Sequence, residues 1–336
     1  MPYTFVPWQN QSEDRVPSEV VGSAHYLASQ RGFLYHQAYS KYNQAYFDRA
    51  RDFSFLVYEG ESLAAIVFAN TVRNEGIGYF NAPVGVFMPS SGVRGTPAIS
   101  ESSDALSGFD EIYKSILAHL IEIARKEKLK HILLREPLEV SSSLAFSKIR
   151  IVENVEGWCD LNESEEDLLR HMRKSYRSLI NWGRRSLDLQ LVSSAKPDKE
   201  AFMAFKALHI EVAGRQTRSD QTWQLQYEAI CENHSYLILA RLEGRLVAGN
   251  LIVCGNDEAY YGVGVNDREL FHDKKGIGHW PLVAAIFEAK RRGHKTFNLG
   301  NVGPTFENEK ERDIGFFKKG FTDRMQSANT ALFEIR

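Results

Sequence analysis

The sequence predicts an α/β (α+β) protein made of two similar domains in tandem, each a twisted mixed sheet flanked by helices, because one pattern of elements occurs twice. Two apolar runs, each interrupted by a Glu-Gly pair, lie at residues 55–68 and 237–253. The two pairs are Glu59-Gly60 and Glu243-Gly244. A glycine between two apolar runs is typical of a tight hairpin, where it adopts positive φ. We expect a duplication, with a binding site along the seam between the copies.

The elements after each hairpin repeat in the same order. Each hairpin is followed by an aromatic-rich strand, an amphipathic helix and a short strand. The first set is Tyr79 and Phe80, a helix at about 111–127 and a strand at 131–134; the second is Tyr260 and Tyr261, a helix at about 279–291 and a strand at 296–299. The chain of 336 residues is long enough for two domains, predicted at 1–150 and 151–336.

Composition excludes several classes of protein. With 43% apolar and 25% charged residues the chain can bury ordinary cores, and a net charge of −2 supplies no general attraction to DNA or anionic membrane. Three dispersed cysteines, without a CxxC pair or a His/Cys cluster, favour reduced thiols in a cytoplasmic protein with no disulfide framework and no metal site. Neither a signal peptide nor a transmembrane run is recognisable.

The sharpest local pattern is a helix predicted over about 165–186. One side carries apolar residues and the opposite side carries cations. The cations are Arg170, Arg173, Lys174, Arg177, Arg184 and Arg185. Such a stripe is commonly a solvated face. Because six like charges repel one another, contact with a polyanion such as tRNA is the alternative, and both interpretations stay open.

Other signals mark ends of elements. A helix over about 198–213 should end at Gly214, and Gly293 suits a left-handed residue after a helix. Residues 88–109 are rich in Ser, Gly and Pro and predict a long loop, with Ser107 and Asp110 as caps of the next helix.

Familiar catalytic motifs are absent, and anion-binding features remain. The chain has no HExxH, GxSxG, Walker or GxGxxG motif. KKGIGH at 274–279 precedes a helix, where backbone N–H groups could hold a pyrophosphate such as that of coenzyme A, although two glycines in a loop can equally be a simple turn. GFFKKGF at 315–321 sets lysines between aromatics, where one could stabilise an oxyanion or phosphate or lie on the surface.

Four stretches in order resemble the FemAB-like aminoacyl transferases, whose fold is two tandem GNAT (Gcn5-related acyltransferase) domains. They are RKSYRSLINWGRRSLDLQLV (173–192), FMAFKALHIEVAGRQTRSDQTWQLQYEAI (202–230), LILARLEGRLVAGNLIVCGNDEAYYGVGV (237–265) and FNLGN (297–301) with GFFKKGF (315–321). Trp223 and the His279-Trp280 pair look like a branch of these proteins associated with surface-polysaccharide synthesis. The resemblance covers most of the second half and, loosely, the first.

The resemblance implies roles for particular residues. Lys318 matches a lysine near the reacting centre, and Arg218 matches a loop arginine that grips the phosphates of a precursor. Lys41, in AYSKY, matches a first-domain lysine that shares this task, and Tyr261 matches an aromatic on the inner face of the hairpin. From the residues alone, each of the four could instead be structural or solvated. Together with Lys275, Gly276 and Gly278 of the anion loop, they are the candidate site residues.

The implied reaction is amide formation, in which an acceptor amine attacks the carbonyl of an acyl donor. We expect the strands at about 247–253 and 259–265 to splay apart and free backbone N–H groups for that carbonyl. No general base is assigned. No cofactor is expected to be bound permanently; acetyl-CoA or aminoacyl-tRNA would be a co-substrate, with tRNA contacting 170–185.

Three functions stay open at this level. The first is an acyl or aminoacyl transferase acting on a phosphate-linked cell-envelope precursor or amino sugar. The second is an acetyl-CoA-dependent N-acetyltransferase of a free small-molecule amine, and the third is a silent binding protein that keeps the fold. The transferred group, the pathway and the oligomeric state are not predicted.

Overall fold

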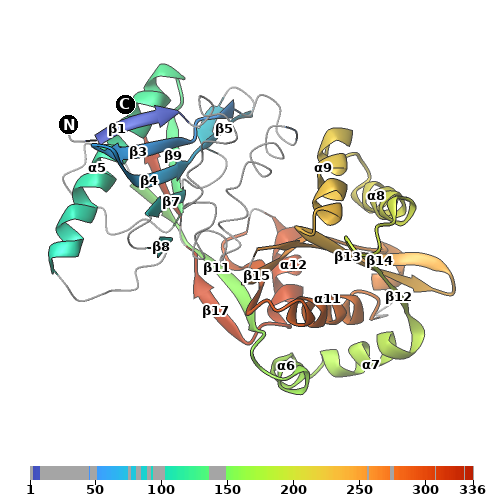
Figure 1. The fold of residues 1–336 in the computed structure, drawn as a ribbon. Coiled ribbons are helices and arrows are strands. Elements are labelled where there is room, and N and C mark those ends of the chain that lie inside the picture. The colour runs from blue at the N-terminus through green and yellow to red at the C-terminus, as the bar shows by residue number, and fades with distance from the viewer. Residues whose placement is uncertain are drawn as a thin grey trace. The chain divides into compact units, whose positions relative to one another are not determined.

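A computed structural model gives the structure of the chain. The residues it describes are 3–7, 45, 51–74, 77–80, 85–88, 92–93, 103–135, 149–255, 257–272, 276–306, 308–328 and 330–335. Among them the chain forms two compact units (Figure 1). The second unit contains Asn154–Ser327, and the first contains the described residues up to Glu153 together with Ala328–Arg336. The last strand of the chain thus completes a sheet of the first unit, whereas the sequence predicts domains of 1–150 and 151–336.

The first unit contains two sheets. One has the order β1-β3-β4-β7-β8 and the other the order β10-β18-β9-β6-β5-β2. Their strands are β1 (Tyr3–Pro7), β2 (Arg51–Asp52), β3 (Phe55–Glu59), β4 (Ser62–Phe68), β5 (Asn70–Asn74), β6 (Ile77–Phe80), β7 (Gly85–Met88), β8 (Gly92–Val93), β9 (His131–Arg135), β10 (Ile149–Val152) and β18 (Thr330–Glu334). Helix α5 (Ser103–Lys126) packs its apolar side on them, with Ile116, Leu117 and Leu120 fully buried.

The second unit is one mixed sheet of seven strands in the order β12-β13-β14-β15-β16-β11-β17. These are β11 (Asn154–Asp160), β12 (Asp188–Val192), β13 (Ser235–Leu242), β14 (Arg245–Cys254), β15 (Glu258–Asn266), β16 (Thr296–Pro304) and β17 (Arg324–Ser327). Its helices are α6 (Glu165–His171), α7 (Tyr176–Ser186), α8 (Lys199–Ala213), α9 (Asp220–Cys231), α10 (Arg268–His272), α11 (His279–Arg291) and α12 (Glu309–Lys319).

Helices cover both faces of this sheet. Side chains point alternately to the two faces along β13, so neighbouring residues of the strand pack against different helices. Leu237 and Leu239 pack beneath α8 and α9, while Tyr236 and Ile238 pack against α11 and the α6–α7 segment. Figure 1 shows α8 and α9 on one side of the sheet and α7 and α11 on the other. Burying each such side chain contributes about 1.5–3 kcal/mol to folding.

The predicted repeat is present in the strand connections. Each unit has a hairpin, a later strand, a helix and then a strand parallel to that later strand: β6 pairs with β9 at Tyr79 and His131, and β15 pairs with β16 at Glu258–Tyr260. In the first unit β5 precedes β6, and β7 and β8 lie between β6 and α5. The second hairpin turns at Glu243 and Gly244, whose φ values of 52° and 82° match a two-residue turn, as predicted. The α/β class is thereby confirmed.

Several predicted boundaries also agree with the structure. The helix over about 198–213 is α8, and Gly214 follows it with φ 69°. Gly293 has φ 88° just after α11, which matches its predicted left-handed conformation.

Two boundaries were predicted wrongly. The helix expected over 165–186 is broken into α6 and α7, because Met172 leaves helical geometry with ψ 150°. The break lets Met172 and Tyr176 both enter the core. The predicted loop at 88–109 contains the short strand β8 and the start of α5 at Ser103, so Ser107 and Asp110 lie inside that helix rather than capping it.

Two simple absences hold for the described residues. None of their helices is long and apolar enough to cross a membrane. No cluster of His, Cys, Asp and Glu there could hold a metal ion. The three cysteines of the chain, all of which lie in described segments, are free thiols.

A test of the packing on the α8 side uses Gly249 in β14. A methyl group there would lie 2.6 Å from the Phe205 ring and 3.0 Å from Leu239, so Gly249→Ala must displace core side chains. We expect the free energy of unfolding to fall by about 1–3 kcal/mol, measured by denaturant titration.

Gly244→Asn is the matched control in the adjoining turn. It adds a larger side chain where nothing lies within 4 Å, in a conformation that asparagine tolerates. The control should change stability by less than about 0.5 kcal/mol. Equal midpoints for Gly249→Ala and the wild type would contradict the packing described here.

Candidate functional site

The sheet of the second unit opens between β15 and β16. The two strands are paired in parallel only at Glu258–Tyr260 with Thr296–Asn298. Beyond these residues β15 continues to Asn266 and β16 to Pro304 without pairing to one another. The sequence predicted the opening one strand away, between 247–253 and 259–265. That prediction was wrong, because β14 and β15 stay paired from Ala248–Asn266 to Cys254–Ala259.

A bulge in β15 lies just past the parting. The β14–β15 register shifts between Leu251 and Ile252, and Gly262 is passed over. Tyr261 therefore faces the α11 side of the sheet, whereas Val263 faces the α8 side. An extra residue bends a strand and redirects its side chains, and such bulges often lie next to active sites.

Lys318 lies in the last turn of α12, close to this parting. Its Nζ lies 5.5 Å from the centre of the Tyr261 ring, in the position of a cation–π contact. A methyl group on Gly300 would lie 3.5 Å from Lys318 Nζ and 3.2 Å from the hydroxyl of Tyr260, so both polar atoms flank the same point of β16. Gly300 has φ 73°, which turns β16 there.

The lysine is poorly hydrated. Burial lowers the pKa of Lys318 to about 8. Among the residues that the structure describes, none accepts a hydrogen bond from its Nζ or pairs with it as an anion. Since a desolvated ammonium without an acceptor is costly, its presence at an opening of the sheet indicates a site for a negatively charged or strongly polar group.

Tyr261 is buried and held firmly. Its hydroxyl lies 3.1 Å from the side-chain amide of Asn250, which is itself 1% exposed. With the amide turned so that its NH₂ donates to the Tyr261 hydroxyl, the amide oxygen accepts from the backbone N–H of Leu282 in α11. A methyl group on Gly264 would lie 1.8 Å from the same hydroxyl, so only glycine fits. Burial raises the pKa of Tyr261.

Arg218 lies in the connection between α8 and α9. It donates to His209 Nε2 at 3.0 Å, and its guanidinium lies 5.3 Å from the centre of the Trp223 ring. Burial, with the nearby charges of Arg218 and Lys310, lowers the pKa of His209 to about 4. Because arginine only donates, the His209 ring is neutral, with its proton on Nδ1.

Arg218 and Lys318 are therefore associated with opposite ends of α12. Lys310, in the first turn of α12, is close enough to His209 to affect its pKa, and Lys318 is in the last turn. Eight helical residues span about 12 Å. In this structure Arg218 and Lys318 make no contact with one another, although both belong to the second unit.

The anion loop before α11 has a packing role. A methyl group on Gly276 would lie 2.6 Å from the carbonyl oxygen of Leu179, and one on Gly278 would lie 2.7 Å from the side chain of Asn266. Tight packing accounts for both glycines, and cofactor binding by them stays a prediction. Lys275 and Lys41 lie outside the described residues.

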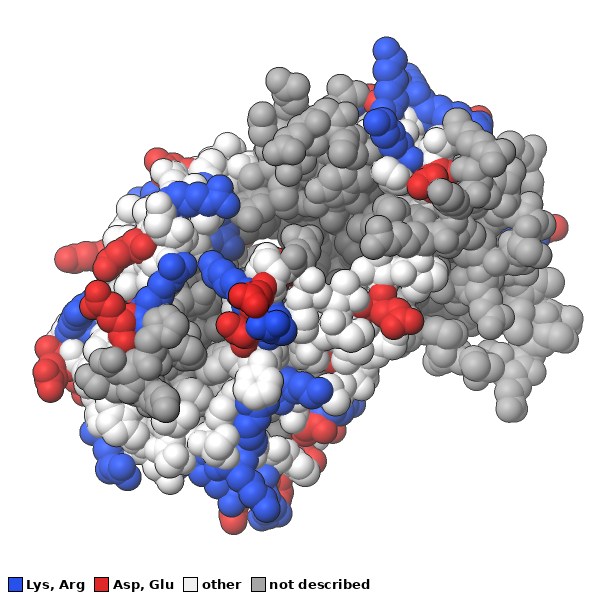
Figure 2. Space-filling model, turned by 180° about the vertical axis from the view of Figure 1, so that it is seen from behind, with Lys and Arg blue, Asp and Glu red and all other residues white. Residues whose placement is uncertain are grey.

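The basic stripe is divided by the structure. Figure 2 shows Lys and Arg gathered along the lower part of the second unit, the region of α6 and α7 in Figure 1. Three of the six cations have partners within the chain: Arg170 pairs with Asp167, Arg173 donates to the carbonyl of Phe316, and Arg184 lies 4.8 Å from the Trp280 ring. The other three cations of the stripe, Lys174, Arg177 and Arg185, are exposed, and none of them forms an ion pair with a described residue.

Some polar residues near the parting were not predicted as site residues. Asn298 donates to Glu156 at 3.0 Å and to Glu258 at 3.4 Å, and its oxygen accepts from the N–H of Gly300. All three side chains are buried. The Asn-Leu-Gly sequence fits the cap-like bond to Gly300, but no signal in the sequence places Glu156 or Glu258 beside it.

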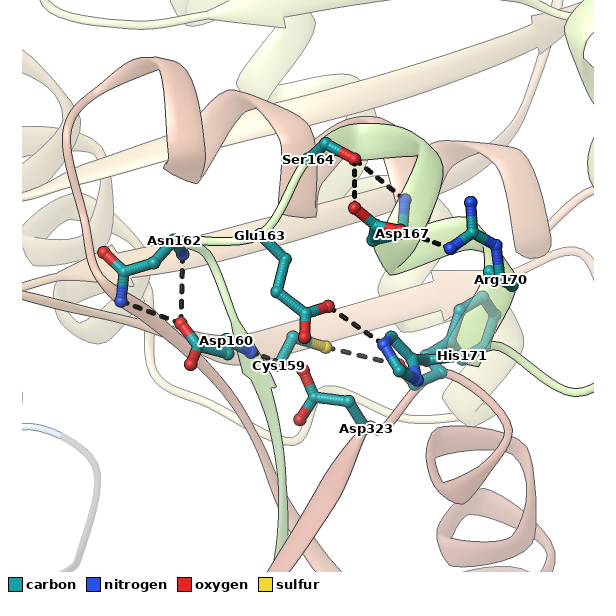
Figure 3. A network of polar contacts seen from close by, with 10 residues as sticks. Cys159, Asp160, Asn162, Glu163, Ser164, Asp167, Arg170, His171 and Asp323 are labelled. Carbon is teal, nitrogen blue, oxygen red and sulfur yellow. Dashed lines mark hydrogen bonds and ion pairs between the residues drawn. The ribbon is translucent and has the colours of Figure 1, made fainter.

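A second polar network fixes the chain that follows α12 (Figure 3). The thiol of Cys159 donates to the carbonyl of Phe321 at 3.2 Å, and the N–H of Asp160 donates to Asp323 at 2.6 Å. Glu163 pairs with His171 nearby. These contacts attach the residues after Lys318 to the end of β11.

Comparison with known proteins agrees with this geometry. FemX is similar with a TM-score of 0.59 and 13% identity, over 89% of this chain and 91% of that one. A tandem GNAT protein from the clavulanic acid biosynthesis pathway is similar with a TM-score of 0.53 and 14% identity, over 99% of each chain. The chain has the tandem GNAT fold.

Another similar structure is the C-terminal domain of a candidate lysylphosphatidylglycerol synthetase from Agrobacterium fabrum, with a TM-score of 0.54 and 14% identity over 94% of this chain and 91% of that one. No family model and no curated protein sequence matches the chain. The expectation of a tandem GNAT fold is confirmed, and the roles of individual residues stay predictions.

The burial of Lys318 has a consequence for stability. The folded-state pKa of about 8 lies below the unfolded value near 10.4, so the unfolded chain binds more protons between these values and wild-type stability rises with pH in this window. Lys318→Met should therefore be more stable than wild type at pH 7, by about 1–3 kcal/mol, and the difference should shrink from pH 8 to pH 10.

The measurement is denaturant unfolding at a series of pH values. Lys319→Met is the control, since Lys319 is the exposed neighbour of Lys318. A Lys318→Met variant less stable than wild type at pH 7 would show that the ammonium is compensated in the folded state.

Proposed function

We propose that this protein is an acyltransferase that forms an amide, moving an acyl or aminoacyl group onto an amine of a phosphate-bearing acceptor. The observation that carries the proposal is the desolvated Lys318 ammonium at the parting of β15 and β16, which has no acceptor in the part of the chain that the structure describes. The tandem GNAT fold supports it, since one similar structure is named as a domain of a candidate lysylphosphatidylglycerol synthetase.

The proposed chemistry follows from charge. When an amine attacks the donor carbonyl, negative charge grows on the carbonyl oxygen, and a preorganised cation in a dry site stabilises that charge strongly. In the proposal Lys318 is this cation. Backbone N–H groups of β15 beyond Tyr260 hold the carbonyl before attack, because no described strand pairs with that edge of β15 past Tyr260.

The proposal uses direct attack by the acceptor amine, so no nucleophilic residue is needed. The new C–N bond replaces the donor's C–S bond, with coenzyme A leaving as a thiol, or its C–O ester bond, with tRNA leaving through its ribose hydroxyl. The amine must arrive neutral, and its proton leaves to water or to a basic group of the acceptor itself. Tyr261 lines the site beneath Lys318, and the Tyr260 hydroxyl lies on the same side of Gly300 as the ammonium. We assign no general base.

Arg218 is proposed to bind the acceptor's phosphate. Its guanidinium is oriented by His209 and Trp223 in the loop between α8 and α9, and the planar fork of an arginine matches the geometry of a phosphate. Arg218 and Lys318 make no contact with one another, which suits an extended acceptor with its phosphate at one end and its amine at the other. Lys41 is proposed to share the phosphate, and the acceptor to be a precursor of the cell envelope.

Substituting Lys318 tests the proposal. Lys318→Met should lower kcat for acyl transfer about 10²–10³-fold, the cost of losing one oxyanion donor. The assay measures thiol release from acetyl-CoA and, in parallel, transfer of labelled aminoacyl groups from charged tRNA, each with nucleotide-linked amino sugars as acceptors. Lys319→Met should keep full activity.

Arg218→Met should act differently. It should raise KM for phosphate-bearing acceptors at least tenfold and leave KM for the same amine without phosphate nearly unchanged. The control Arg215→Met, in the same loop, should change neither KM. Full activity of Lys318→Met, or loss of turnover with every acceptor in Arg218→Met without a change in KM, would refute the assigned roles. A free-amine acetyltransferase would ignore the phosphate altogether.

The donor can be identified through Lys174, Arg177 and Arg185. If aminoacyl-tRNA is the donor, replacing all three by methionine should weaken its binding and reduce the slope of log affinity against log salt by about 2–3. If acetyl-CoA is the donor, the same triple variant should transfer acetyl groups at the wild-type rate. Binding and rate measured from 50 to 300 mM salt, about the range over which phosphate contacts show, separate the two.

A further inference from the structure

We propose that Arg173 and Tyr176 form a clamp on the last turn of α12 that positions Lys318. This inference rests on the proposed function, since it concerns the same lysine. It assigns Arg173 a role inside the protein, whereas the sequence placed it in a basic stripe that was either solvated or in contact with a polyanion.

The clamp begins at the carbonyls of the last turn of α12. The last carbonyls of a helix have no partner within it and carry partial negative charge. Arg173 donates to the Phe316 carbonyl at 3.1 Å, and the Tyr176 hydroxyl donates to the Phe317 carbonyl at 3.2 Å. The backbone N–H of Arg173 donates to the carbonyl of Gly320 at 2.8 Å. The turn that contains Lys318 is thus held from three carbonyls.

The two clamp residues are coupled to one another. Arg173 also donates to the Tyr176 hydroxyl at 3.1 Å. Its guanidinium lies 4.0 Å from the centre of the Phe316 ring and 4.9 Å from that of Tyr176. The Arg173 guanidinium therefore orients Tyr176 and stacks on the Phe316 ring of α12. It also places positive charge at the negative end of α12.

The break between α6 and α7 makes the clamp possible. Arg173 lies in the non-helical segment after Met172, and Tyr176 is the first residue of α7. A continuous helix would use the N–H of Arg173 within itself, so it could not reach Gly320. The break therefore frees the N–H of Arg173 to bind the carbonyl of Gly320.

The packing around Tyr176 leaves no room for movement. A methyl group on Gly320 would lie 2.1 Å from the Tyr176 ring, so glycine is required after Lys319. The His279 ring lies 4.5 Å from Tyr176 and 5.2 Å from Phe317, edge to face. From the other side, β11 holds the carbonyl of Phe321 through Cys159.

The charged and titratable groups around this turn are few. Tyr260 and Tyr261 of β15 face Lys318, and His279 of α11 faces Phe317, with the pKa of His279 lowered to about 4 by burial and by Arg173. The pKa of Lys318 is lowered by burial alone. Loosening the clamp should let water reach the ammonium, so this pKa reports on the position of the lysine.

Competitive labelling with acetic anhydride measures that pKa in the full-length protein without knowledge of the substrate. Only the neutral amine reacts, and mass spectrometry of the Lys318 peptide gives the extent of reaction at each pH. Wild type should show a midpoint near pH 8. Arg173→Met and Tyr176→Phe should each raise the midpoint by about 1 unit or more, toward the value of about 10.4 for an exposed lysine.

Arg177→Met on α7 is the control and should leave the midpoint unchanged. Tyr176→Phe removes a single oxygen, so it decides the matter if Arg173→Met does not fold. Midpoints for Tyr176→Phe and any folded Arg173→Met that equal the wild-type value would overturn the clamp.

Acyl transfer by Lys318→Met, measured in parallel, separates this inference from the proposed function. Shifted midpoints with full activity of Lys318→Met would keep the clamp and remove the catalytic role. Unshifted midpoints with an inactive Lys318→Met would remove the clamp and keep the catalytic role.

Discussion

The site depends on one physical constraint. The ammonium of Lys318 is held away from water at the point where the parallel strands β15 and β16 part. The short pairing of β15 with β16 creates an opening in an otherwise continuous sheet. Lys318 reaches that opening from α12 and meets the face of Tyr261 rather than an anion. A fold optimised only for stability would pair or expose such a charge, so the arrangement is expected where stability is exchanged for activity.

The residues around Lys318 are tightly packed, so the site has little freedom to rearrange. Gly264 and Gly320 admit the rings of Tyr261 and Tyr176 so closely that no other residue fits. Asn250 links Tyr261 to α11, and the Cys159–Phe321 bond ties the end of α12 to β11. A preorganised site pays its reorganisation cost during folding, before any substrate binds.

The sequence predicted what local chemistry and periodicity determine. The duplicated hairpins, the helices at α8 and α11 and the strands that follow the helices are all read from patterns within about twenty residues. It misplaced the opening of the sheet by one strand, because hydrophobic alternation does not reveal which neighbours a strand pairs with. It also joined α6 and α7, since a helical pattern survives a break that keeps Met172 and Tyr176 buried.

The site residues also fall into two groups, those that a short segment of sequence can identify and those that only the fold brings together. Lys318 was singled out through the resemblance of one short segment, GFFKKGF at 315–321, to the FemAB-like proteins, whereas the residues alone left it equally a surface lysine. The role of Arg173 could not be predicted in this way, because its partners lie about 140 positions away, at Phe316 and Gly320. Glu156, Glu258 and Asn298 likewise meet only through the fold.

The state of Lys318 at neutral pH decides how it can act. With a pKa of about 8, the protonated form exceeds the neutral amine by about ten to one at pH 7. The Tyr261 ring beneath Nζ favours the charged form further, because the negative face of an aromatic ring attracts a cation. An ammonium can donate to a developing oxyanion but cannot accept a proton from the attacking amine. Stabilisation of charge, rather than base catalysis, is therefore the chemistry that this lysine is built to supply.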